Sequence, residues 1–109
     1  MQRAYRKSDE GDKLVEKKDF EGAAQAYAES ARLAPGNVEL IFWQAVALWK
    51  LDKRSEARPL FARVFAAPDG ANWRRLVPRL VAPGLIPGDA AGIAEIGAIP
   101  AAGGKRGKP

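Results

Sequence analysis

The side chains that most often perform catalysis are rare in this sequence. Its 109 residues include no histidine and no cysteine. Their absence removes the commonest general base, the commonest metal ligand and the thiol nucleophile. Among the serines, we expect Ser55 to cap a helix and Ser30 to fill a small position of a helical repeat. The sequence therefore predicts a protein that is not an enzyme.

Acidic and glycine-rich segments offer no better site. Asp9, Glu10 and Asp12 are close in sequence, but they fall in a predicted helix with lysines nearby. Gly103-Gly104-Lys105 lacks the preceding strand and the following helix of a phosphate-binding loop. We predict no metal site and no cofactor.

The net charge of +5 allows attraction to anionic polymers. Most of the excess lies in residues 53–79, at Lys53, Arg54, Arg58, Arg63, Arg74, Arg75 and Arg79. These charges are spread out, which favours a solvated helix face. Nucleic acid is therefore not the expected partner, and binding of an anionic polymer is the weaker alternative.

No long apolar run and no secretory signal are present, and the first twenty residues are charged throughout. We therefore expect no membrane span, and a cytoplasmic location is the default.

An internal repeat indicates which elements position the remaining side chains. A shift of 34 residues pairs small, large and aromatic residues in the same order: Gly11 with Ala45, Leu14 with Leu48, Ala23 with Ala57, Tyr27 with Phe61, and Ser30 with Val64. This period is typical of tetratricopeptide repeats, each of which is a helical hairpin. The small residues allow the helices to approach closely, and the aromatic residues fill the space between hairpins.

Helix signals agree with this period. Residues 2–17 predict a first helix, Asp19 and Asn37 are suited to cap the second and third, and Ser55 the fourth. A fifth helix over residues 71–81 would cover the end of the stack, with a kink or stop at Pro78. We expect residues 83–87 to dock in an extended form.

The predicted fold is all-α, with two tetratricopeptide-like antiparallel hairpins and a C-terminal capping helix. This helical domain would span residues 1–87. Residues 88–109 are rich in glycine, alanine and proline and end in basic residues, which predicts a disordered tail.

A second set of residues suggests a more specific family. It comprises Ala34-Pro35-Gly36-Asn37, Glu39 to Trp43, Ala45 to Leu48, Trp73, Leu76, Arg79-Leu80 and Gly84-Leu85-Ile86-Pro87. Residues 9–87 resemble the C-terminal segment of a bacterial family of unknown function whose N-terminal part is Ntn-hydrolase-like. The resemblance implies peptidoglycan binding, which is the label that this C-terminal domain carries. The hydrolase-like part has no counterpart here, so none of its activity is implied.

In tetratricopeptide hairpins the first helix lines the concave face. This register predicts a ligand-binding groove made of Tyr5, Asp12, Glu39, Phe42, Val46, Trp49 and Lys50. Phe42 and Trp49 lie two turns apart and could grip a peptide side chain or stack on a sugar ring. For Phe42 a place in the core is an equal alternative, whereas Trp49 is expected to be exposed. Trp43 and Trp73 are expected in the core and the cap.

The predicted function is that of a non-catalytic module that binds a peptide or peptidoglycan in this groove. The carboxylate clamp of chaperone-binding repeats is not supported, because Tyr5, Glu39 and Phe42 occupy its positions. The alternative is a structural appendage that docks on another protein or forms a homodimer, since two repeats are fewer than the usual three.

Overall fold

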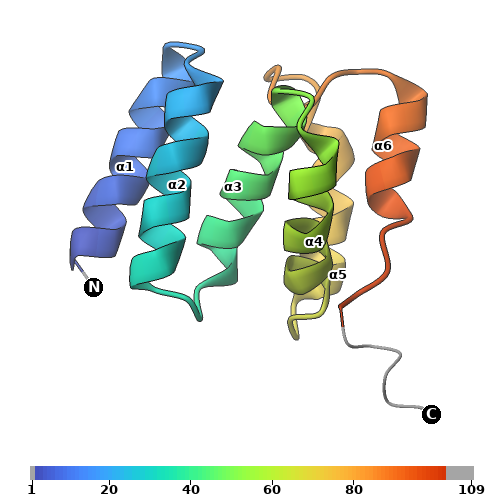
Figure 1. Ribbon diagram of the computed structural model, residues 1–109. Helices are drawn as coiled ribbons and strands as arrows, with labels where there is room; N and C mark the ends of the chain where they lie inside the picture. Colours follow the sequence, from blue (N-terminus) through green and yellow to red (C-terminus); the bar gives the residue numbers. More distant parts are fainter. Residues whose placement is uncertain (1, 103–109) are drawn as a thin grey trace.

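The computed structural model describes residues 2–102, of which residues 2–5 are described by their backbone alone. This part of the chain contains helices and no strand: α1 (Gln2–Glu16), α2 (Phe20–Leu33), α3 (Val38–Lys50), α4 (Arg54–Phe65), α5 (Gly70–Leu76), the short 3-10 helix η1 (Val77–Leu80) and α6 (Ala90–Gly97). The helices stack side by side, with α1 and α2 at one end and α6 at the other (Figure 1). The predicted all-α fold of tetratricopeptide-like hairpins is confirmed.

The two hairpin loops repeat the 34-residue period in their backbone geometry. Lys18 in the first loop and Asp52 in the second both adopt left-handed backbone, with φ of 62° and 64°. In each loop the N–H groups of this residue and the next donate to carbonyl groups at the end of the preceding helix. These bonds satisfy the helix end. The sequence period therefore reflects two copies of one structural unit.

Two of the three predicted caps are present. The side chains of Asp19 and Asn37 accept hydrogen bonds from N–H groups in the first turns of α2 and α3, at 2.9 and 3.1 Å. The cap predicted at Ser55 is wrong. Helix α4 already begins after Lys53, which forms no side-chain cap, and Ser55 lies exposed inside the first turn.

Small residues bring the helices of each hairpin into close contact. Gly11 and Ala45 are buried, as are Ala23 and Ala57. The ring of Tyr27 lies against Gly11 so closely that a Cβ atom there would meet it at 2.8 Å. Glycine at this position therefore sets the distance between α1 and α2.

Aromatic residues fill the space between the packed helices. Tyr27 and Phe61 are buried, as the repeat predicts. The ring centre of Phe61 lies 6.0 Å from that of Phe42, 6.1 Å from Trp49 and 5.8 Å from Phe65. The core is thus built around a cluster of rings that joins α3 to α4.

The predicted fifth helix forms and stops near its proline. Helix α5 ends at Leu76, and Pro78 takes an early position of η1, where its missing N–H is tolerated. Residues 83–87 dock as expected, since Ile86 is buried and its N–H donates to the carbonyl of Leu80 at 3.2 Å. The segment turns before it docks and is not extended.

The disordered tail predicted from residue 88 is wrong as far as residue 102. Residues 90–97 form α6, which begins where the carboxylate of Asp89 accepts a hydrogen bond from the N–H of Gly92 at 2.8 Å. Ile96 and Ile99 are buried in the core. Burial of this isoleucine face offsets the low helix propensity of the glycines.

Polar contacts also hold this segment. The guanidinium of Arg74 donates to the carbonyls of Gly97 and Ile99 at 2.6 and 2.9 Å, and Arg54 pairs with Glu95 at 3.1 Å. The helical domain therefore continues past residue 87 to residue 102. The basic residues predicted to close the tail, Lys105, Arg106 and Lys108, lie outside the described residues.

Replacing Gly11 with alanine is expected to destabilise the protein by roughly 1–3 kcal/mol. The new methyl group would overlap the buried ring of Tyr27, which outweighs the gain in helix propensity of about 1 kcal/mol. Gly36→Ala is the control, because no atom lies within 4 Å of a Cβ there. Chemical denaturation followed by circular dichroism compares the two. Equal stability of Gly11→Ala and the parent would contradict the close contact.

Replacing Ile96 with alanine is expected to cost roughly 2–4 kcal/mol, because it leaves a cavity under α6. Ala94→Ser, at an exposed position of the same helix, should change the stability by less than about 0.5 kcal/mol. Thermal and urea unfolding measure both. An Ile96→Ala variant as stable as the parent would mean that α6 does not pack on the domain.

Candidate functional site

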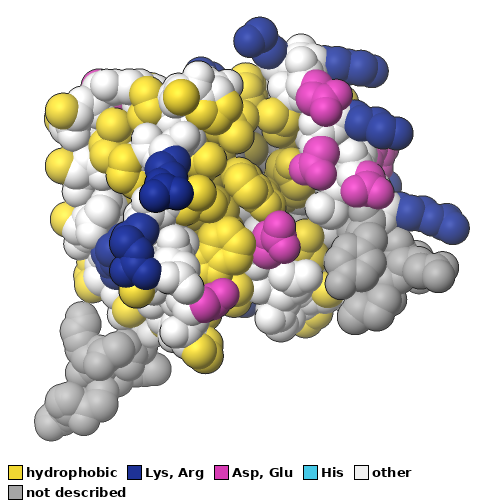
Figure 2. Space-filling view, turned by 180° about the vertical axis from the view of Figure 1, so that it is seen from behind, with side chains coloured by type: hydrophobic (Ala, Val, Ile, Leu, Met, Phe, Trp, Pro, Cys, Tyr) yellow, Lys and Arg dark blue, Asp and Glu magenta, His cyan; other side chains and the backbone are white. Residues whose placement is uncertain are grey.

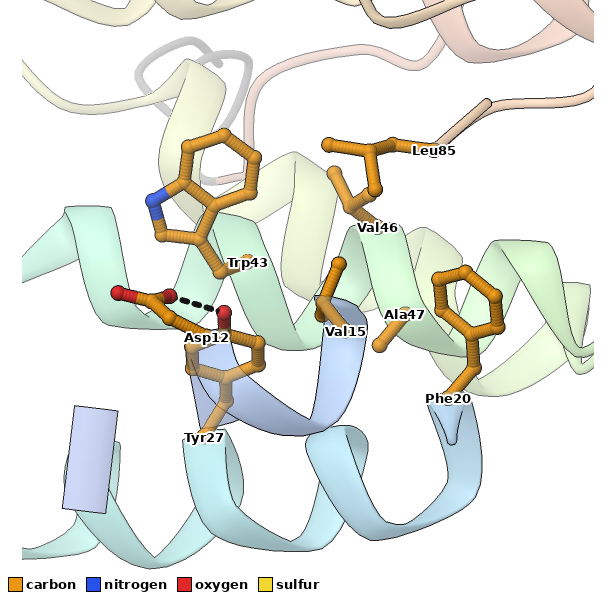
Figure 3. Close-up of a pocket in the computed structure, with 8 residues that line it drawn as sticks. All are labelled: Asp12, Val15, Phe20, Tyr27, Trp43, Val46, Ala47 and Leu85. Carbon is orange, nitrogen blue, oxygen red and sulfur yellow. Dashed lines mark hydrogen bonds between the residues drawn. The ribbon is translucent and has the colours of Figure 1, made fainter. Parts of the chain in front are cut away.

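A pocket opens on the face formed by the first helices of the hairpins. It has a volume of about 170 Å³ and is lined by Asp12 and Val15 of α1, Phe20 and Tyr27 of α2, Trp43, Val46 and Ala47 of α3, and Leu85 from the turn after η1. Figure 3 shows these side chains converging from the two hairpins and the turn. Hydrophobic side chains occupy the middle of this face in Figure 2.

The pocket is apolar in its depth. Val46 and Ala47 are almost fully buried, whereas Val15, Trp43 and Leu85 are half-buried. All five pack against the main core. The lining of the pocket is therefore continuous with the core and open to solvent. Ligand sites are usually lined by apolar side chains in this way.

Two carboxylates lie at one end of the pocket. The hydroxyl of Tyr27 donates a hydrogen bond to Asp12, drawn as the dashed line in Figure 3. The indole N–H of Trp43 donates to Glu39, one turn earlier on α3, at 3.4 Å. Each carboxylate is therefore oriented by an aromatic residue that lines the pocket.

Burial raises the pKa of Tyr27 well above its usual value, and the hydrogen bond to Asp12, the charge of Asp12 and the charge of Glu39 raise it further. The phenol therefore keeps its proton and remains a donor to Asp12. Because the charges of Asp12 and Glu39 both act on the Tyr27 hydroxyl, both carboxylates lie close enough to the pocket to interact with a charge there.

The other end of the pocket carries a cation. The ammonium of Lys50 lies 5.5 Å from the centre of the Phe20 ring. Glu39 is in the first turn of α3 and Lys50 in the last. The pocket thus lies along α3 between an acidic end and a basic end.

The structure brings four of the predicted groove residues to this pocket. Asp12 and Val46 line it, and Glu39 and Lys50 lie at its two ends. The side chain of Tyr5 lies outside the described residues.

The exposure predicted for Trp49 is wrong, and Phe42 takes its alternative place in the core. Phe42 is 0% exposed and Trp49 is 1% exposed. The ring of Phe42 packs on Trp73 at 4.9 Å, and the guanidinium of Arg54 covers Trp49 at 4.6 Å. Both rings point toward α4 and α5, so they are unable to contact a ligand in the pocket.

Trp43 is one of the pocket residues that the sequence interpretation missed, since it was expected in the core. It follows Phe42 directly, and one residue turns an α-helix by about 100°. The sequence does contain a pattern that indicates the position of Trp43. Trp43, Val46, Ala47 and Lys50 follow the i, i+3, i+4, i+7 spacing of a single helix face.

The basic residues of the second half are partly used inside the protein. Arg54 and Arg58 pair with Glu95, and Arg74 binds backbone carbonyls while stacking on Phe65. Arginines such as Arg75 and Arg79 remain exposed. The basic region is therefore less able to hold an anionic polymer than its sequence indicates.

Within residues 2–102 no three potential metal ligands gather at one place, and no helix is long and apolar enough to span a membrane. Ser30 is buried and Ser55 lies exposed on α4, apart from the pocket. The pocket itself brings an apolar lining together with the carboxylate of Asp12.

Replacing Tyr27 with phenylalanine is expected to change how stability depends on pH. The folded-state pKa of Tyr27 lies above 10.0, the ordinary value. Above about pH 10 the unfolded chain alone loses this proton, so the free energy of unfolding falls by up to about 1.4 kcal/mol per pH unit. Urea unfolding from about pH 8 to pH 11 should show this loss in the parent and not in Tyr27→Phe. A stability difference that does not vary with pH would contradict the buried, protonated phenol.

Comparison with known proteins identifies the repeat. A family model described as Tetratricopeptide repeat matches residues 14–80, more than half of the chain. The comparisons with curated proteins and with solved structures give no match. The match does not show the resemblance to a peptidoglycan-binding domain. Repeats of this kind are typically non-catalytic helical modules that take part in protein–protein interaction. The chain belongs to the tetratricopeptide repeat family.

Proposed function

We propose that this protein is a non-catalytic module that binds a segment of a partner protein in the pocket between α1 and α3. The observation that supports this is the half-buried Trp43 beside an apolar floor that remains open to solvent. A ligand that covers apolar surface of this kind removes it from water, and this burial favours binding.

The size of the pocket suits one large apolar side chain. A cavity of about 150 Å³ is enough to hold a benzene ring, and this pocket measures about 170 Å³. An aromatic or large aliphatic residue of a peptide would contact Trp43, Val46 and Leu85 there. The rest of the peptide would lie along α1 and α3.

The polar groups of the pocket favour a peptide over a glycan. A sugar ring needs several hydrogen-bonding partners beside the ring on which it stacks. Here both aromatic donors are engaged, since the hydroxyl of Tyr27 donates to Asp12 and the N–H of Trp43 donates to Glu39. At this end of the pocket the two pairs therefore offer carboxylate acceptors to a sugar but no free donor. Peptidoglycan binding therefore rests on the sequence resemblance alone, and we do not adopt it.

A homodimer, in which a second copy covers the end of the stack, is also less favoured. The sequence interpretation counted two hairpins and one capping helix, which is fewer than the usual three repeats and suggested that a partner covers remaining apolar surface. In the structure α6 lies at that end and buries Ile96 and Ile99. Helix α6 therefore covers apolar surface that a second copy would otherwise cover in a homodimer.

Peptide selection from a random library on the immobilised protein tests this function. We expect enriched peptides with a bulky apolar residue in common, and roughly five- to tenfold weaker binding to Val15→Ser, which removes apolar contact in the pocket. Val38→Ser is the matched control, because this valine is also half-buried but does not line the pocket.

An absence of enriched peptides, or peptides that bind Val15→Ser as tightly as the parent, would contradict the proposal. Two further measurements cover the alternatives. Retention on insoluble peptidoglycan would favour the cell-wall function, and sedimentation that changes with protein concentration would favour the homodimer.

A further inference from the structure

The charges around the pocket restrict which peptide fits it. Asp12 and Glu39 lie at one end, and both side chains are exposed. Within the described residues neither takes part in an ion pair, whereas acidic residues elsewhere, such as Glu29 and Glu95, do. The pocket therefore presents two negative charges that no cation in this part of the protein neutralises.

These two carboxylates are held in place. Asp12 accepts the hydrogen bond of Tyr27, which burial keeps protonated, and Glu39 accepts that of Trp43. Groups oriented in advance lose less conformational entropy when a ligand binds. A cation arriving at this end would find its counter-charges already positioned.

The acidic character is local. The chain as a whole carries a net charge of +5, so its overall field does not attract a cationic ligand. In Figure 2 acidic side chains lie beside the apolar middle on the α1 side, whereas basic side chains lie farther out on that side and also on the opposite side. Lys50 at the Phe20 end disfavours a second cation there. Only one end of the pocket thus complements a positive charge.

We propose that the pocket binds a partner peptide in which lysine or arginine stands next to a bulky apolar residue. The apolar side chain enters between Val15 and Trp43, and the cation lies beside Asp12 and Glu39. This inference rests on the proposed peptide-binding function and specifies its ligand. Residues 103–109 of this chain are basic but contain no large apolar side chain, so they do not fulfil both conditions.

Three blocked heptapeptides test the inference, each titrated into the isotopically labelled full chain and followed by nuclear magnetic resonance. The first has a central phenylalanine between two arginines, the second replaces both arginines with glutamate, and the third replaces the phenylalanine with alanine. The first should bind about tenfold more tightly than either of the others. It should shift the signals of Val15 and Trp43 most.

Amide variants isolate the contribution of charge. In Asp12→Asn combined with Glu39→Gln, the amide oxygens still accept the hydrogen bonds of Tyr27 and Trp43, so the pocket keeps its shape while losing its charge. The preference for arginine over glutamate should then disappear. Glu21→Gln is the matched control, because this exposed carboxylate lies by another surface hollow, and it should retain the preference.

Equal or tighter binding of the glutamate peptide would overturn this inference and leave peptide binding in the pocket intact. So would a preference for arginine that survives in the double variant. If no heptapeptide shifts the pocket signals, the inference also fails. The library selection then shows separately whether peptide binding fails with it.

Discussion

Phe42 and Trp49 project from the side of α3 that faces α4 and α5, where their rings meet Phe61 and Trp73. Both are almost fully buried, and each large ring removes some 150–250 Å² from water, roughly 4–6 kcal/mol of hydrophobic free energy. This contact sets the rotation of α3 about its own axis. The adjoining side of the helix, with Trp43 and Val46, is consequently left to face α1 and to form the pocket.

The charged ends of the pocket depend on the same rotation. Glu39 lies one turn before Trp43, and Lys50 one turn after Val46, so all four lie on one side of α3, next to the side that carries the ring cluster. On the facing hairpin, Gly11 lets Tyr27 approach α1 closely enough to hold Asp12. Packing in the core and polarity at the site are therefore two consequences of one helix arrangement.

Much of the fold could be predicted from the sequence, because the 34-residue period places Gly11, Ala45, Tyr27 and Phe61 by steric need alone. The missed helix α6 was harder to predict, since Gly92 and Gly97 lower its helix propensity and tertiary contacts, such as the burial of Ile96, stabilise it. Of the predicted groove, Asp12 and Val46 line the pocket, and Glu39 and Lys50 lie at its ends. The prediction erred between Phe42 and Trp43, because the i, i+7 spacing of Phe42 and Trp49 fits a core face as well as a groove.

The rotation of α3 is tested most directly by hydrogen exchange of the three indole N–H groups, resolved by nuclear magnetic resonance and assigned by single tryptophan-to-phenylalanine variants. Trp49 is 1% exposed, whereas Trp43 and Trp73 are half-buried. The account predicts slow exchange at Trp49, limited by unfolding, and much faster exchange at Trp43. Fast exchange at Trp49 together with protection of Trp43 would place the Trp43 side of α3 in the core and contradict the pocket between α1 and α3.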